Sequence, residues 1–185
     1  FLRCKTCDLI FADPKNLLNT EIEKSRYESH NNSQRSKGYE SFLRTLIDPV
    51  KKYITKESKG LDFGSGPYPL KKLDTKLKVI ILFLIQTPHY LKKMYEFVTC
   101  CEVVEHFNRP IDSFRLLCSL LNTNSILGIK TTLFKEEIEF KNWYYKNDDT
   151  HVSFYSKITI DWIAKKFGLK VLEIEDRLVI FQKIS

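Results

Sequence analysis

The feature that most constrains the fold is an alternation of short apolar segments with amphipathic ones, which begins near Lys59. Four of the apolar segments have the length of strands and read GLDFG, KVIILFL, EFVTCCEV and SILGIKTTLF. Strands that alternate with helices form parallel sheets covered on both faces. The pattern therefore predicts an α/β fold of three layers with a mostly parallel sheet.

The C-terminal part of the pattern predicts how the sheet ends. The segment SKITIDWIAKKFG has helical spacing, with Ser156 as N-cap and Gly168 as C-terminal stop. Two apolar segments follow it, LKVLEIE and RLVIFQK, and only a short turn can separate them. Because neighbours joined by a short turn pair antiparallel, we expect an antiparallel pair at one edge of the sheet.

Two further segments predict helices. Residues 16–56 are polar and helical in tendency. We expect them to form helices that cover the α/β core of residues 57–185, with Pro49 bending or restarting one of these helices. Their apolar positions recur at helical spacing at Phe42, Leu43, Leu46, Ile47, Val50 and Ile54. Between the third and fourth strands a second helical stripe is predicted at Ile111, Phe114, Leu117, Leu120 and Leu121.

A glycine loop follows the first strand in the sequence LDFGSGPYPL. Asp62 ends the strand, and Gly64, Ser65 and Gly66 follow it. Glycines let the backbone turn tightly and approach a ligand, while a helix that follows offers free N–H groups. A plain tight turn uses the same residues, so the loop indicates cofactor binding only together with other features.

A cluster of polar residues follows the third strand in the sequence CEVVEH. Glu102 is expected to end the strand, and Glu105 and His106 begin the next turn, so two carboxylates and an imidazole can converge. Two oxygens and one nitrogen suit Mg²⁺ or a softer divalent ion. The alternative is that Glu102 borders a cofactor while the other two organise the turn. Without a metal, His106 or His151 is a candidate general base, because imidazole titrates near neutral pH.

The cysteines and aromatic residues leave alternatives open. Cys4 and Cys7 form a C-x-x-C pair, which is either half of a zinc site completed upstream of Phe1 or two ordinary thiols. The chain starts without Met, so we expect a longer protein upstream. The segment NWYYKNDDTHVSFY either walls a substrate pocket or packs as a lid on the sheet, through Trp143, Tyr144, Tyr145, Phe154 and Tyr155.

The amino-acid composition limits the kinds of partner that the chain can bind. The net charge of +7 and the pI of about 9.1 permit an anionic partner such as RNA, although the lysines are scattered and form no basic stripe. No apolar run approaches the roughly 18 residues of a membrane-spanning helix. We therefore expect a soluble, cytoplasmic protein with no membrane partner, and its oligomeric state stays open.

From about Tyr27 onwards, the segments LDFGSGP and YEFVTCCEVVEHFNRP with the closing strands resemble class I S-adenosylmethionine-dependent methyltransferases. The resemblance is strongest to a bacterial branch with Y-x-x-H-x-N ahead of the loop. It implies a Rossmann-like sheet, with S-adenosylmethionine bound by Asp62, Gly64, Ser65, Gly66, Cys101, Glu102, His30 and Tyr39. Only 33 residues separate Gly64 from Val98, too few for the family's second and third strands with their helices, so the third strand is expected to be missing.

The resemblance extends to two metal motifs. The E-x-x-E-H spacing resembles the metal-binding motif of ubiquinone-pathway O-methyltransferases and small-RNA 2′-O-methyltransferases, which implies Glu102, Glu105, His106 and His151 as ligands of Mg²⁺ or another divalent ion. The C-x-x-C pair resembles the zinc-binding segment that precedes some relatives. Residues 1–15 are accordingly expected to be its remnant, and residues 16–185 the methyltransferase-like domain.

Two departures from the family pattern define the alternatives. Tyr68 replaces the usual third glycine, and Leu84 stands near the place of the acid that binds the ribose hydroxyls. The leading hypothesis is a methyltransferase that acts on an unidentified small molecule. The alternatives are a degenerate domain that binds without turnover and a metal-dependent RNA 2′-O-methyltransferase.

Overall fold

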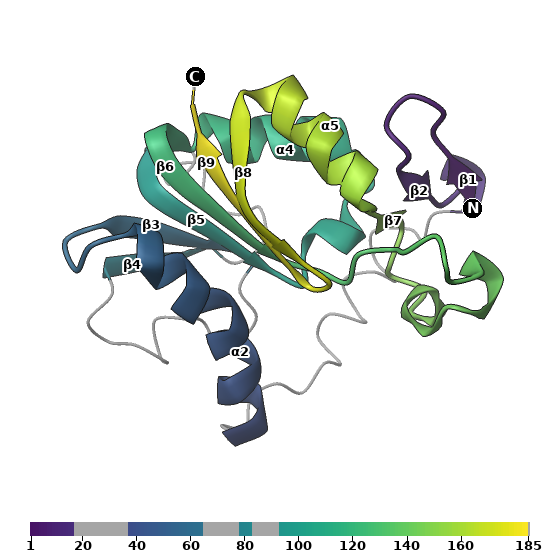
Figure 1. Ribbon diagram of the computed structural model, residues 1–185, viewed down its shortest axis with the longest axis horizontal. Helices are drawn as coiled ribbons and strands as arrows, with labels where there is room; N and C mark the ends of the chain where they lie inside the picture. Colours follow the sequence, from purple (N-terminus) through teal and green to yellow (C-terminus); the bar gives the residue numbers. More distant parts are fainter. Residues whose placement is uncertain (17–36, 65–77, 83–92, 185) are drawn as a thin grey trace.

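A six-stranded sheet forms the centre of the computed structural model, which describes residues 1–16, 37–64, 78–82 and 93–184 (Figure 1). The strand order is β4-β3-β5-β6-β9-β8. The strands are β3 (Lys59–Phe63), β4 (Lys78–Leu82), β5 (Tyr95–Cys101), β6 (Leu121–Lys130), β8 (Leu169–Glu175) and β9 (Leu178–Lys183). The first four strands pair in parallel, whereas β9 is antiparallel to both β6 and β8. The predicted α/β fold with an antiparallel C-terminal pair is confirmed.

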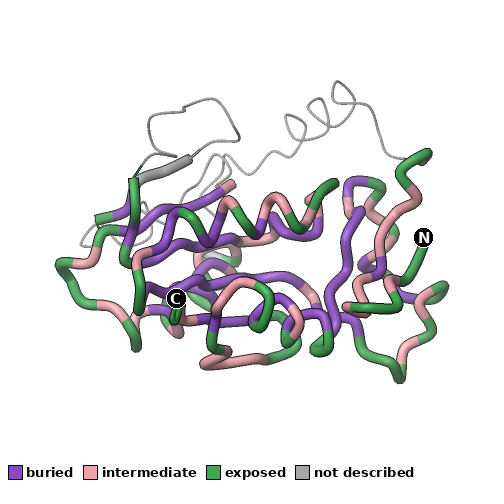
Figure 2. The backbone as a smooth tube through the Cα atoms, turned by 90° about the horizontal axis from the view of Figure 1, so that it is seen from above, coloured by how far each residue is buried: buried purple, intermediate pink, exposed green. Residues whose placement is uncertain are grey.

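Helices cover both faces of this sheet, which completes the three layers (Figure 1). On one face α2 (Lys37–Val50) packs over Phe97, and on the other α4 (Pro110–Ser119) and α5 (Lys157–Phe167) pack over Val98. The two neighbours on β5 face opposite ways because side chains alternate along a strand. Purple buried positions accordingly follow the strands and the inner sides of the helices in Figure 2.

Among the described residues the sheet has six strands, as expected if the family's third strand is missing. The connection between β4 and β5 includes residues 83–92, which lie outside the described residues. Within the described part, β4 is the edge strand on that side.

Two local predictions need correction. The predicted helical stripe is wrong at its C-terminal end, because α4 stops at Ser119 and Leu121 already pairs with Tyr95 as part of β6. Ile111 is also 49% exposed and does not belong to the buried stripe. An apolar pair at the end of a helix suits a buried strand equally well, so spacing alone could not place this boundary.

Pro49 lies in the last turn of α2, and the short 3-10 helix η2 (Lys51–Tyr53) follows.

The N-terminal residues form a second, small sheet. The strands β1 (Leu2–Arg3), β2 (Ile10–Phe11) and β7 (Ser153–Phe154) pair antiparallel, and η1 (Pro14–Asn16) follows β2. This sheet lies beside α5 (Figure 1). Its pairing links residues 1–15 to the rest of the chain, and the division of the chain at residue 16 stays a prediction.

The aromatic segment packs mainly against this second sheet. It contains the 3-10 helices η5 (Phe140–Asn142) and η6 (Tyr144–Asn147). A buried cluster joins Ile10, Phe134, Trp143, Tyr145 and Phe154, whereas Tyr155 belongs to the main core and Tyr144 is 63% exposed. The structure therefore favours packing over a substrate wall for most of these rings.

Helix α5 has the ends that the sequence predicts, and Ser156 also links it to the N-terminal hairpin. Its side chain accepts a hydrogen bond from the backbone N–H of Thr159, and its hydroxyl donates to Asp8 Oδ2 at 2.5 Å. At the other end Gly168 is left-handed, with φ of 63°.

Replacing Ser156 with alanine is expected to lower the free energy of unfolding by about 1–2 kcal/mol, because both the helix cap and the link to Asp8 are lost. Urea denaturation measures the difference. Lys157→Ala, at the exposed next position, is the matched control and should change little. Equal stability of both variants would contradict the capping role.

Candidate active site

The predicted site residues gather where β3, β5 and β6 end. Parallel strands end at the same edge of a sheet, and the register places Phe63 beside Cys100 and Cys101 beside Lys130. The turn between β8 and β9 also reaches this edge, since Ile129 pairs with Val179. This edge is where α/β sheets bind ligands.

The end of β3 carries a buried acid, Asp62, and the strand is followed by a glycine with a left-handed backbone, Gly64. Asp62 is buried and accepts a hydrogen bond from Thr99 Oγ1 at 3.0 Å. Gly64 has φ of 70°, and a Cβ there would lie 2.8 Å from both γ-carbons of Val103. Only glycine fits this position without strain, so the backbone at Gly64 passes close to the turn after β5.

Tyr39 on α2 and Cys101 at the end of β5 lie near Asp62. Burial raises the pKa of Tyr39 to about 12, with smaller contributions from Cys101 and Asp62. Burial also raises the pKa of the Cys101 thiol, and Glu102 and Asp62 add to the effect. Both groups are therefore neutral at pH 7 and offer weakly polar surface rather than charge.

Three side chains meet just after β5. Glu102 has a left-handed backbone with φ of 51°, and Glu105 is fully buried in the 3-10 helix η4 (Val104–His106). The hydroxyl of Tyr145 lies 2.8 Å from Glu102 Oε2 and 2.6 Å from Glu105 Oε1. The remaining oxygen of Glu102 accepts a hydrogen bond from Arg177 Nη2 at 3.1 Å. Tyr145 therefore bridges the two carboxyl groups.

Both short contacts of the Tyr145 hydroxyl can be hydrogen bonds only if one of the two carboxyl groups is protonated. A phenol has a single proton, so Tyr145 donates to one carboxylate at a time. Burial, followed by the charge of Glu102, raises the pKa of Glu105 to about 8. At pH 7 a protonated Glu105 can donate to the phenol oxygen while the phenol donates to Glu102, which satisfies both short contacts.

Two histidines complete the cluster. His106 Nδ1–H donates to the Thr150 carbonyl at 2.9 Å, and His151 Nδ1–H donates to the Tyr145 carbonyl at 2.7 Å. One ligand atom each from Glu105, His106 and His151 lie within 4.8 Å of one another. Burial, with the neighbouring His151, lowers the pKa of His106 to about 4, so this ring is neutral at pH 7.

The structure brings together most of the predicted site, with one change. Glu102 is not part of the group of close ligand atoms, because its oxygens face Tyr145 and Arg177. The sequence predicted that Tyr145 either walls a pocket or packs as part of a lid, and it did not indicate Lys130 or Arg177. The predictions for His30, Ser65, Gly66, Tyr68 and Leu84 concern residues outside the described part of the chain.

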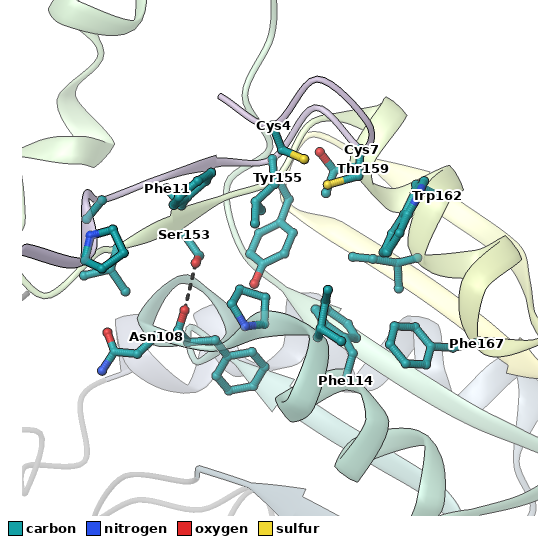
Figure 3. A pocket seen from close by; sticks show the side chains of 18 residues that line it. Cys4, Cys7, Phe11, Asn108, Phe114, Ser153, Tyr155, Thr159, Trp162 and Phe167 are labelled. Atoms are coloured by element: carbon teal, nitrogen blue, oxygen red, sulfur yellow. Dashed lines mark hydrogen bonds between the residues drawn. The ribbon is translucent and has the colours of Figure 1, made fainter. Parts of the chain in front are cut away.

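Cys4 and Cys7 lie away from this edge, in the loop between β1 and β2. Backbone N–H groups of Cys7 and Thr6 lower the pKa of Cys4, whereas burial raises that of Cys7. Both side chains face an apolar cavity of about 280 Å³ between the hairpin, α4 and α5 (Figure 3). Its wall includes Phe114, Trp162 and Phe167, and it shares no lining residue with the cluster after β5.

The comparisons with known proteins identify the family of this chain. The family model described as a methyltransferase domain matches residues 32–174, more than half of the chain. The chain belongs to this family. The predicted membership of a methyltransferase family is confirmed. No curated protein sequence matches the chain.

Solved structures show the same fold at low identity. The 1,6-didemethyltoxoflavin-N1-methyltransferase of Burkholderia thailandensis, solved with 1,6-didemethyltoxoflavin and S-adenosylhomocysteine, has a TM-score of 0.66 at 8% identity, over 100% of this chain and 99% of that one. A methyltransferase of Bacillus halodurans has a TM-score of 0.62 at 13% identity, over 78% and 100%. An O-methyltransferase family protein of Burkholderia thailandensis has a TM-score of 0.57 at 11% identity. This chain aligns over 88% of its own length but spans 63% of that protein.

None of the described helices of this methyltransferase domain combines the length and apolarity needed to span a membrane.

Proposed function

We propose that this domain transfers a methyl group from S-adenosylmethionine to a small-molecule acceptor at the edge where β3, β5 and β6 end. The observation that carries the proposal is that Gly64, the buried acid Asp62 and the carboxylate of Glu102 lie at this edge. The sulfonium is a good leaving group, so the protein mainly has to align donor and acceptor and exclude water.

Each site residue has a proposed role. Asp62, Gly64, Tyr39, Cys101 and Glu102 line the cofactor, together with Ser65, Gly66 and His30, which the family resemblance adds. His151 and His106 lie nearest the acceptor as candidate bases. The lowered pKa of His106 makes it a weak proton acceptor, so His151 is the better candidate.

Calorimetric titration with S-adenosylhomocysteine tests the proposal. Binding below millimolar concentration supports it, and absence of binding would contradict it for this chain. The alternative, a degenerate domain that binds a ligand or partner protein without turnover, predicts no methyl transfer from labelled S-adenosylmethionine to any acceptor in a metabolite extract. An RNA acceptor, a cytoplasmic location and membership of the bacterial branch stay predictions from the sequence.

A second proposal concerns a divalent cation held by Glu105, His106 and His151. Glu105 Oε2 is buried without a hydrogen-bond partner among the described residues. The two histidines donate Nδ1–H to backbone carbonyls, which is how metal-binding imidazoles are commonly oriented. Of the ions that the sequence left open, Mg²⁺ or a softer divalent ion, two nitrogens and one oxygen suit a softer one such as Mn²⁺, Fe²⁺ or Zn²⁺ better. A bound cation would lower the pKa of an acceptor hydroxyl.

If this cation site exists, Mn²⁺ is expected to raise the thermal midpoint of the wild-type protein, and His151→Ala should remove the increase. A second variant, Glu105→Gln, should do the same, because an amide is a weaker ligand than a carboxylate. Thermal unfolding with Mn²⁺ and with EDTA measures the effect. Asp161→Asn, at an exposed position on α5, is the control. Equal responses of all variants would contradict the proposal.

Cys4 and Cys7 remain proposed as half of a zinc site. The backbone N–H groups that lower the pKa of Cys4 favour the thiolate that zinc requires. The described residues provide no group of three close ligand atoms around this pair. Two further ligands would have to come from elsewhere.

A further inference from the structure

Lys130, the last residue of β6, is a buried cation without an ion pair among the described residues. The residue is only 5% exposed. Its ammonium group donates to Thr45 Oγ1 at 2.6 Å and lies 4.4 Å from the centre of the Phe42 ring. The hydroxyl of Thr45 in turn donates to the Phe42 carbonyl, so its oxygen is oriented to accept from Lys130. These neutral contacts position the ammonium but leave its charge unbalanced.

Arg177, in the turn between β8 and β9, brings a second cation to the same place. Its guanidinium lies 5.9 Å from the centre of the Phe42 ring, and its Nη2 donates to Glu102 at 3.1 Å. Glu102 also accepts a hydrogen bond from the hydroxyl of Tyr145. Of the two cations only Arg177 contacts this carboxylate, so Lys130, Arg177 and Glu102 together carry a net positive charge.

Burying the charged ammonium group of Lys130 costs free energy. Burial lowers its pKa and the charge of Arg177 lowers it further, although Cys101 and Glu102 oppose the shift. An apolar side chain could replace Lys130 in packing α2 on β6, because Leu46 and Val50 already pack there against Gly128. Buried charges are normally paired, so an ammonium kept at a ligand-binding edge indicates an anionic ligand.

We propose that Lys130 and Arg177 bind a carboxylate or phosphate group of the methyl acceptor. The proposal rests on the proposed function and names the substrate class for it. Both cations lie next to Glu102, at the ends of β5 and β6, where the acceptor has to meet the methyl donor. One negative charge on the acceptor would neutralise the surplus of the group. Arg177 offers a planar pair of N–H donors for such an anion, and Lys130 offers a point charge.

Anion binding in the presence of saturating S-adenosylhomocysteine tests the proposal. The probes are benzoate and inorganic phosphate, measured by calorimetry, and they distinguish a carboxylate from a phosphate acceptor. The wild-type protein is expected to bind one of them, and Lys130→Met and Arg177→Met should each weaken that binding by about tenfold. Lys130→Arg should retain most of it. Lys170→Met removes an exposed lysine on β8 and is the charge-matched control.

A second measurement does not depend on the anion probes. If the charge of Lys130 serves a ligand, Lys130→Met should raise the thermal midpoint of the ligand-free protein while it loses anion binding. A lower midpoint with unchanged anion affinity would show a purely structural lysine and overturn the proposal. Failure of the wild-type protein to bind either anion would overturn it as well.

The cofactor's own carboxylate is the remaining source of negative charge. The variants should bind S-adenosylhomocysteine within about twofold of the wild-type protein. Weaker binding of S-adenosylhomocysteine, with unchanged binding of 5′-methylthioadenosine, which lacks the amino-acid part, would assign the cations to the cofactor and overturn the acceptor proposal. If S-adenosylhomocysteine does not bind the wild-type protein, the proposed function fails, and anion binding without it is tested separately.

Discussion

Replacing Gly60 with alanine is expected to lower the free energy of unfolding by about 3 kcal/mol or more. Gly60 lies in β3 between two neighbouring strands, and an added Cβ would lie 2.1–2.4 Å from three ring carbons of Phe97. Phe97 is fully buried beneath α2 and cannot move without displacing that helix. Urea denaturation, followed by circular dichroism, measures the loss.

Two further variants make the Gly60 prediction specific. Phe97→Leu, combined with Gly60→Ala, should recover part of the loss, because the smaller side chain makes room for the added methyl group. Gly38→Ala is the control, since Gly38 is exposed within α2 and alanine favours helices. It should stabilise the protein slightly. A loss below about 1 kcal/mol for Gly60→Ala would contradict the close packing of β3 on Phe97.

Replacing Gly64 with alanine is expected to weaken the binding of S-adenosylhomocysteine by about tenfold or more. The residue would have to keep φ of 70° and place its Cβ 2.8 Å from Val103, so the loop would shift away from the turn after β5. That turn carries Glu102, the proposed cofactor contact. Calorimetry measures the dissociation constant in the variant and in the wild-type protein.

Gly128→Ala is the matched control for Gly64. Its Cβ would lie 2.6 Å from Val50 beneath α2, whereas that of Gly64 would meet Val103. This variant should lose stability but keep its affinity for S-adenosylhomocysteine. Val103→Ala should restore part of the affinity of Gly64→Ala. If Gly64→Ala bound the cofactor within twofold of the wild-type protein, the loop would not be the cofactor loop.

Features with local causes could be predicted from the sequence. The ends of α5 follow from Ser156 and Gly168, whose preferences act within one helical turn. The strand alternation predicted the parallel sheet, and the short turn before β9 predicted the antiparallel pair. The prediction that Leu121 belongs to a helix was wrong, because an apolar residue can be buried equally well at the end of a helix and at the start of a strand.

The site was predicted less completely because its contacts span long stretches of chain. Glu105 and His106 could be placed together from their spacing, but Tyr145 reaches them from 40 residues away. Arg177 meets Glu102 across 75 residues, and Lys130 meets Thr45 across 85. Neither pairing leaves a local pattern. The bridge by Tyr145 is also why Glu102 does not join the group of close ligand atoms.

The position of β9 has a consequence for how the chain is made. β9 is the last strand in the described sequence, yet it lies between β6 and β8. During synthesis both neighbours exist before residues 178–183 do, so the nascent chain must hold two unpaired strand edges apart until β9 enters. Unpaired edges promote aggregation. Slow translation of the codons that follow β8 would prolong that exposure, which makes this part of the coding sequence a sensitive point for expression.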